Sequence, residues 1–270
     1  MRALPGGERG AYLRARRCVA GMRPEDALAC ADRLAAAGLA SSIDYFGENV
    51  SDPIEADRVT DHYVALAQTL ERAPENTFLS IDLSHIGLDQ AGVAVQQRLE
   101  RIASALPAGR WIQVGAEQER RADRILAAVS AVAGRGGAVS ATIQANLKRS
   151  REDARALAEG GVPIRLVKGA YVEEPRVARP WGEPTDLAFL ELAHELRAGG
   201  AEVAIATHDA ILREALLRAL PGIGVEMLLG VRSADANVLA CRGVPVRIYV
   251  PYGDGWFRYA MRRWAESVGR

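Results

Sequence analysis

The chain has 270 residues, of which 49% are hydrophobic and 25% charged, with 34 basic and 34 acidic side chains. This apolar content is enough for one substantial core and is unlike that of a disordered chain. The equal numbers of acids and bases argue against a general polyanion-binding protein, because nucleic-acid-binding modules normally carry a large basic excess.

No apolar run approaches the roughly 20 residues that span a bilayer, and the first ten residues lack the apolar stretch of a secretory signal. We therefore expect a cytoplasmic protein. The cysteines are Cys18, Cys30 and Cys241, and their odd number argues against a disulfide framework. Neither they nor the histidines have metal-ligand spacing, so we predict no metal site.

The elements predicted along the chain alternate between short β-rich runs and longer amphipathic runs. A helical segment comes first, within residues 1–38, with its pattern at Ala11–Ala37. The expected strands are Ala40–Phe46, Thr77–Leu83, Trp111–Val114, Val139–Gln144, Pro163–Val167, Glu202–Ala206, Gly224–Leu229 and Val246–Val250. Between them we expect helices at Glu55–Arg72, Ala91–Ala105, Arg120–Ala133, Ser150–Ala158, Asp186–Ala198 and Ala210–Ala219.

Alternating strands and helices favour parallel pairing, because a parallel crossover usually takes a helix. Eight such pairs in about 250 residues is the size of a (βα)8 barrel, so the predicted fold is an α/β barrel over residues 39–270. A doubly wound open sheet is the alternative, but no GxGxxG motif follows the first strand.

Barrel enzymes carry their chemistry at the carboxyl ends of the strands, so the residues there are candidates for a site. They are polar almost throughout: Glu48, Asn49, Asp82, Glu117, Gln144, Arg165, Lys168, Thr207, His208, Asp209, Arg232, Tyr249 and Tyr252. Simpler interpretations stay open. Glu48 fits a loop turn, Glu117 a solvated helix start, and His208 a core histidine. Gln144 fits either a structural hydrogen bond or a cofactor contact.

Two cations interrupt the strand in the segment RLVKGAY, residues 165–171. Alternation places Arg165 and Val167 on one face, and Leu166 and Lys168 on the other. Buried cations require anionic partners, which a phosphate or a reduced flavin ring can supply. Gly169 and Ala170 leave room for a flat ligand close to the backbone.

The C-terminal segment predicts a helix that carries Tyr259, Arg262, Arg263 and Glu266 on one sector of its surface. A solvated charged face explains this pattern. Alternatively, the adjacent arginines clamp a carboxylate, for which the planar guanidinium is well suited.

Taken together, these residues resemble the proline dehydrogenase family, in particular its monofunctional bacterial members. The matching stretches occur in the family's order: FGENV (46–50), SIDLSHIGLD (80–89), TIQANLKRS (142–150), RLVKGAY (165–171), ATHD (206–209), EMLLGVR (226–232) and RIYVPYGDGWFRYAMRRWAE (247–266). The resemblance implies a distorted (βα)8 barrel that holds FAD non-covalently across the strand ends. It also implies oxidation of L-proline to 1-pyrroline-5-carboxylate, with electrons passed to a quinone at the membrane surface, where the protein would associate peripherally.

The resemblance also implies roles for individual residues. Arg165 would lie near flavin N5, where a cation stabilises negative charge on the ring. The flavin and its nucleotide tail would be held by Gln144, Val167, Lys168, Gly169, Ala170, Thr207, His208 and Glu266. The substrate carboxylate would be clamped by Arg262 and Arg263, and its ring enclosed by Tyr171, Leu228, Tyr249 and Tyr259. Glu48 would gate the site by pairing with one of the arginines.

Two positions depart from the family pattern. Asp82 stands where the family has a lysine that joins the arginines on the substrate carboxylate, and Gly115 aligns with an aspartate of the third strand. Reversing a charge beside the carboxylate weakens proline binding, so one alternative is a related flavoenzyme that oxidises a different amine in specialised metabolism. A Schiff-base lyase that uses Lys168 is a second alternative, and a regulatory protein on an inactive scaffold is a third.

Overall fold

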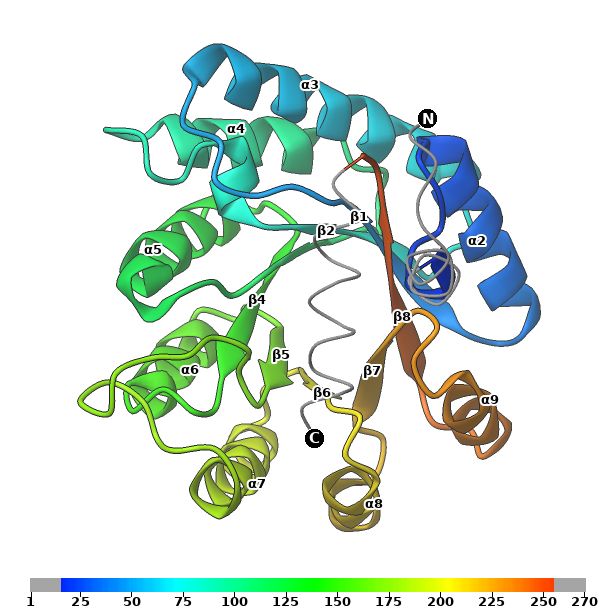
Figure 1. The fold of residues 1–270 in the computed structure, drawn as a ribbon, viewed down its shortest axis with the longest axis vertical. Coiled ribbons are helices and arrows are strands. Elements are labelled where there is room, and N and C mark those ends of the chain that lie inside the picture. The colour runs from blue at the N-terminus through cyan, green and yellow to red at the C-terminus, as the bar shows by residue number, and fades with distance from the viewer. Residues whose placement is uncertain (1–15, 255–270) are drawn as a thin grey trace, which may run out of the picture.

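The computed structural model describes residues 16–254, and within this range eight parallel strands close into a barrel in sequence order. Figure 1 shows the strands at the centre, with helices α2 to α9 around them in chain order. The strands are β1 (Ala40–Tyr45), β2 (Thr77–Ile81), β3 (Ile112–Val114), β4 (Val139–Gln144), β5 (Ile164–Val167), β6 (Val203–Ala206), β7 (Gly224–Leu228) and β8 (Val246–Tyr252). The predicted (βα)8 barrel is confirmed.

The α-helices are α2 (Pro24–Ala36), α3 (Pro53–Thr69), α4 (Ala94–Ser104), α5 (Ala122–Ala133), α6 (Ser150–Glu159), α7 (Glu183–Ala198), α8 (Ala210–Ala219) and α9 (Ser233–Cys241). Short 3-10 turns lie at η1 (Arg16–Cys18), η2 (Leu70–Arg72), η3 (Leu83–Ile86) and η4 (Glu119–Arg121). The last two lie in the loops after β2 and β3. They shape the end of the barrel where the candidate site residues gather.

The helical opening predicted over Ala11–Ala37 consists, over the part that the structure describes, of two helical pieces, η1 and α2. The chain leaves η1 in an extended path, and Ala20 donates its backbone N–H to Pro251 of β8 at 2.9 Å. Helix α2 begins only at Pro24, because a proline fits the first turn of a helix but breaks its interior. The buried side of α2, with Ala27 and Ala31, joins the same hydrophobic core as the barrel.

Helix α9 was not predicted from the sequence. It is short, and only Ala236 and Leu239 are buried on it, whereas Val238 is exposed. Because so few of its residues face the core, the sequence shows no clear apolar stripe.

The two faces of the barrel strands differ in chemistry. Ile43, Leu79, Leu166, Met227 and Val250 are buried in the core between the strands and the surrounding helices. Alternate positions line the interior and are small or polar: Ala40, Gln113, Ser140, Arg165, Ala204, Gly224, Glu226 and Arg247 border one cavity of about 390 Å³. The same cavity is bordered by residues that precede their strands, such as Asn76, Pro163 and Glu202, so it lies toward the amino ends of the strands, and Arg165 and Glu226 border it from the interior.

Candidate active site

The closed parallel barrel brings the carboxyl ends of all eight strands to one end of the molecule. The loops or last residues of successive strands therefore place the predicted site residues together. They are Glu48, Asp82, Gly115, Gln144, Val167, Lys168, Gly169, Ala170, Tyr171, Thr207, His208, Leu228 and Tyr249. The predicted Tyr259, Arg262, Arg263 and Glu266 lie outside the described residues.

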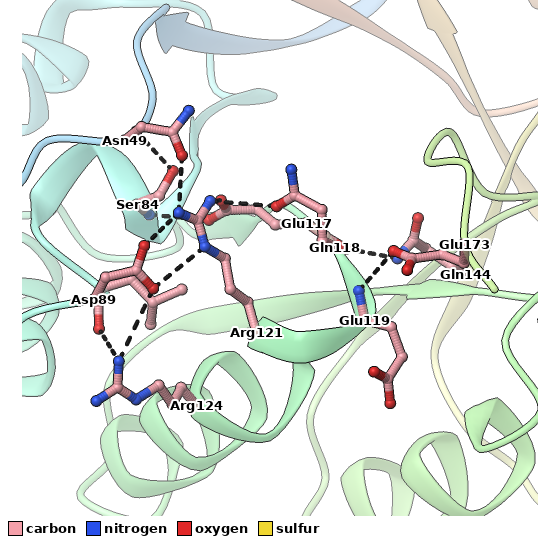
Figure 2. A network of polar contacts seen from close by, with 11 residues as sticks. Asn49, Ser84, Asp89, Glu117, Gln118, Glu119, Arg121, Arg124, Gln144 and Glu173 are labelled. Carbon is pink, nitrogen blue, oxygen red and sulfur yellow. Dashed lines mark hydrogen bonds and ion pairs between the residues drawn. The ribbon is translucent and has the colours of Figure 1, made fainter. Parts of the chain in front are cut away.

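Glu117 lies at the centre of a polar network that joins the loops after β1, β2 and β3 (Figure 2). One carboxylate oxygen accepts the Ser84 N–H at 2.9 Å, and the other pairs with Arg121 Nη1 at 2.7 Å. Arg121 Nη2 donates to Asn49 Oδ1 at 2.8 Å and also binds Asp89. Glu117 is only 4% exposed, so its interpretation as a solvated helix start is wrong. It connects three loops of the candidate site.

Gln144 extends this network to the loops after β4 and β5. Its Nε2 donates to the Glu117 carbonyl at 2.8 Å, and its Oε1 accepts the Ala170 N–H at 3.4 Å. The Glu173 carboxylate accepts the Glu119 N–H at 2.8 Å in the same region, as Figure 2 shows. The buried amide of Gln144 is thus satisfied by backbone groups, which fulfils the structural interpretation. Its role toward a cofactor stays a prediction.

The segment FGENV after β1 packs closely against His85 of the β2 loop. A Cβ added to Gly47 would lie 2.1 Å from His85 Nε2, so only glycine fits at this position. Burial lowers the pKa of His85 to about 4, although the backbone near Tyr45 and the charge of Glu55 oppose this effect. A neutral imidazole therefore supports the half-buried Glu48 segment from below.

The two departures from the family pattern, Asp82 and Gly115, touch each other in space. The Gly115 N–H donates to Ile81 of β2 at 2.8 Å, which brings the two strand ends together. A Cβ added to Gly115 would lie 1.9 Å from Asp82 Oδ1. The Asp82 carboxylate thus occupies the space that a side chain at position 115 would take. Asp82 and Gly115 thus pack against each other, and the loop after β2 provides the acid at this point of the site.

The two cations of RLVKGAY diverge as alternation predicts, because Leu166 is fully buried outside the barrel while Arg165 lines its interior. Arg165 Nε lies 2.9 Å from Glu226 Oε2. Lys168 Nζ lies 2.5 Å from Asp186 Oδ1 and 3.5 Å from Asp209 Oδ2. That a phosphate or a reduced flavin ring can supply anionic partners for these cations stays a prediction. In the contacts described, the partners are the protein's own carboxylates, which sequence reasoning did not pair with the cations because they come from β7 and from helix starts.

The surroundings of Lys168 do not favour Schiff-base chemistry. Nucleophilic lysines are typically desolvated or placed beside another cation, which makes the neutral amine accessible. Lys168 instead lies between two carboxylates. Burial raises the pKa of Asp209, but N–H groups of α8, chiefly that of Leu212, and the Lys168 charge lower it overall.

The ATHD segment after β6 is tied to the end of β7. Thr207 Oγ1 accepts the Asp209 N–H at 3.1 Å, and Asp209 in turn caps α8 by accepting from Ile211 and Leu212. His208 is half-buried, and its Nε2 accepts the Leu228 N–H at 3.2 Å. This hydrogen bond joins the loop after β6 to the end of β7.

Asp44 is a buried acid of β1 that sequence reasoning missed, although a lone aspartate in the strand sequence ASSIDY is a visible signal. It accepts hydrogen bonds from Tyr63 Oη at 2.7 Å and from Tyr249 Oη. Burial raises the pKa of Asp44 to about 6, against the opposing effects of Tyr249, Tyr63 and the charge of Arg165. Asp44 holds the hydroxyl of Tyr249, the predicted substrate-facing tyrosine of β8.

The candidate cofactor residues come from β4, β5 and β6, which are neighbours in the barrel. Gly169 has a φ of +122°, and a Cβ there would lie 2.2 Å from Asn146 Oδ1. That oxygen is buried and has no hydrogen-bond partner among the described residues. The Asn146 side chain thus packs against the bare backbone of Gly169, and its unpartnered oxygen is an acceptor that a bound cofactor could use.

Residues 16–254 have neither a metal-binding cluster nor a membrane-spanning helix. They contain no group of three or more side chains able to hold a metal ion. Their helices include none with the length and apolar character needed to cross a bilayer.

Comparison with known proteins places this geometry in a family. The family model described as proline dehydrogenase matches residues 27–268. Proline dehydrogenase 1 of Bacillus subtilis (strain 168) is 34% identical over 265 residues, which cover 95% of this chain and 88% of the relative. Proline dehydrogenase of Deinococcus radiodurans is 31% identical over 268 residues, covering 94% and 86%.

Solved structures share the fold. Proline utilization A of Bdellovibrio bacteriovorus superposes with a TM-score of 0.84 at 19% identity, covering 95% of this chain and 33% of that one. Proline utilization A of Corynebacterium freiburgense gives 0.79 at 20% identity, covering 96% and 31%. The chain thus spans about a third of the length of these two proteins. Its sequence match extends over nearly the whole barrel, and the chain belongs to the proline dehydrogenase family.

Proposed function

We propose that the chain oxidises L-proline to 1-pyrroline-5-carboxylate with FAD bound non-covalently at the carboxyl end of the barrel. The observation that carries this proposal is the polar site that the strand ends assemble in a chain of this family, with Arg165 inside the barrel below it. As a member of the proline dehydrogenase family, the enzyme is an oxidoreductase that acts on CH–NH groups. Bound FAD would supply the two-electron acceptor for the hydride from the carbon next to the ring nitrogen.

The residues of this chain would bind and orient both molecules. Gln144, Val167, Lys168, Gly169, Ala170, Thr207, His208 and Glu266 would hold the cofactor. Arg165 would place positive charge where negative charge develops on reduction. The buried oxygen of Asn146, which packs against Gly169, supports this assignment, because it is an acceptor without a partner among the described residues.

Substrate binding would depend on the C-terminal segment. Arg262 and Arg263 would clamp the carboxylate, while Tyr171, Leu228, Tyr249 and Tyr259 would enclose the ring. The clamp would also favour the neutral amine that hydride transfer requires, since nearby cations lower the pKa of an ammonium group. Glu48 would close the site by pairing with one arginine. Asp82, which lies over Gly115, would face this region as an acid.

The electrons would then pass to a quinone, which the enzyme would meet by contacting a membrane surface peripherally. The family match favours proline over a different amine. Asp82 nevertheless makes proline affinity a quantity to measure, because an acid near a bound carboxylate opposes binding.

The visible spectrum of the purified protein tests the proposal directly. The spectrum is recorded before and after anaerobic addition of L-proline, and again after added FAD if the protein is colourless. A flavin band that bleaches with proline supports cofactor and substrate together. A flavin band that persists refutes proline as the substrate but leaves the cofactor in place. A protein that takes up no FAD refutes the proposal as a whole.

A further inference from the structure

An ion pair crosses the interior of the barrel between β5 and β7. Arg165 Nε lies 2.9 Å from Glu226 Oε2, and the two side chains are 16% and 6% exposed. Strand β6 separates their strands and presents Ala204 beside Arg165 and Ala206 beside Glu226. Because both intervening side chains are single methyl groups, the two long side chains meet directly.

Glu226 is held in place by partners on other strands. Gln113 of β3 donates through Nε2 to both carboxylate oxygens, at 2.8 and 2.9 Å, and is 3% exposed. Arg247 Nε is farther away, at 3.9 Å. Its Nη1 donates to the carbonyls of Ser41 and Asn76 at 3.0 and 2.9 Å. Arg165 is therefore the cation most directly paired with Glu226.

The pair adjoins the polar cavity of about 390 Å³, whose lining also includes Glu202 and Arg197. Keeping charged groups inside a protein is costly unless they are paired and hydrogen-bonded. Glu226 meets this condition through the Gln113 amide and the charge of Arg165. Arg165 Nε makes no hydrogen bond among the described residues, so its contact with Glu226 is that of an ion pair.

We propose that Glu226 is a positioning residue that fixes the Arg165 guanidinium and offsets part of its charge beneath the flavin. This inference rests on the proposed function, because it requires FAD above Arg165. An arginine paired with a carboxylate stabilises negative charge on a neighbouring group less than an unpaired arginine does. Glu226 therefore keeps the two-electron potential of the bound flavin lower than Arg165 alone would set it.

The test is a redox titration of the flavin-loaded protein against a reference dye, without substrate. In Glu226→Gln the shape is kept and the charge is lost, so reduction should become more favourable by about tenfold. For a two-electron couple this corresponds to a midpoint potential about 30 mV higher. Glu202→Gln is the matched control, since it removes a charge from the same cavity without touching Arg165. Its potential should equal that of the unmodified protein.

Each outcome decides between defined alternatives. An unchanged potential in loaded Glu226→Gln overturns the inference but leaves the proposed function intact. An equal rise of the potential in Glu202→Gln also overturns it, because the loss of any negative charge from the cavity would then explain the effect. A wild-type protein that takes up no FAD overturns the proposed function and the inference with it. If Glu226→Gln does not fold, Glu226→Asp replaces it in the test. This variant keeps the charge but moves it away from Arg165 by one methylene, so the midpoint potential should rise by less than in Glu226→Gln. An unchanged potential in Glu226→Asp would refute the inference.

Discussion

Asp44 provides a stability prediction whose sign and size follow from its surroundings. The carboxyl group is 4% exposed and accepts hydrogen bonds from Tyr63 and Tyr249. Burial dominates, and the pKa rises from 3.8 to about 6 despite the tyrosines and Arg165. At 1.36 kcal/mol per pKa unit, this rise means that folding favours the protonated carboxyl group over the ionised one by about 3 kcal/mol.

The sign follows from proton binding. Between pH 4 and pH 6 the folded protein binds a proton at Asp44 more tightly than the unfolded chain does. The contribution of protonated Asp44 to the free energy of unfolding is therefore fully present below pH 4 and is lost as the pH rises through about 6. His85 acts in the opposite direction: its pKa is lowered to about 4 by burial, so its contribution grows as the pH rises from about 4 to 6.5.

Asp44 and His85 change the free energy of unfolding in opposite directions as the pH rises. The prediction therefore compares a variant with the unmodified protein at each pH. Asp44→Asn keeps His85 and removes only the titrating acid. Urea unfolding at intervals from pH 4 to pH 7.5 should show the variant gaining about 3 kcal/mol relative to the unmodified protein across this range. In Tyr249→Phe the Asp44 carboxylate loses a hydrogen-bond donor, so its pKa should rise. The pH-dependent loss of stability should then occur at higher pH. A difference between Asp44→Asn and the unmodified protein that is constant with pH would refute the reasoning.

Three further predictions concern the loops of the site. Glu117→Gln should lower the free energy of unfolding by about 2 kcal/mol in urea, because it breaks the buried pair with Arg121; a loss below about 0.5 kcal/mol would contradict the network. Gly47→Ala should cost about 2 kcal/mol or more, since its Cβ would lie 2.1 Å from the imidazole after β2, and an unchanged melting temperature would count against this packing. Gly115→Ala should destabilise the unmodified protein by about 1 to 3 kcal/mol but have little effect in an Asp82→Ala background, and simple additivity of the two would show that the positions are independent.

Most of the barrel could be predicted because its local signals agree with its global pattern. The predicted strands coincide with the observed ones to within two residues at each end, as in Val139–Gln144, because β-branched runs alternate with amphipathic helices. Helix α9 is missing from the predicted elements for a local reason, because it buries too few residues to leave an apolar stripe in the sequence.

The sequence predicted that polar residues gather at the strand ends, but not the contacts among them. Alternation placed Arg165 and Leu166 on opposite faces of the strand, and the structure confirms this, with Arg165 lining the barrel interior and Leu166 fully buried. The partners of the cations could not be predicted, because Glu226 lies 61 positions away from Arg165 in the sequence and meets it only when the barrel closes. Glu117 was misjudged for the same reason, since its burial depends on Arg121 and on the loop after β2.

The interior of this barrel holds two acids near Arg165, and Arg247 is a second cation that lies farther from Glu226. Asp44 acts electrostatically on Arg165 from β1, and Glu226 pairs with it from β7. Asp44 also holds Tyr249, whereas Glu226 is tied to Gln113, so each acid links Arg165 to a different part of the barrel. Neutralising either acid should therefore leave Arg165 with a stronger field, but only the loss of Asp44 should also release the tyrosine. An interior filled by bulky apolar side chains could not set the charge and the geometry of the site in this way.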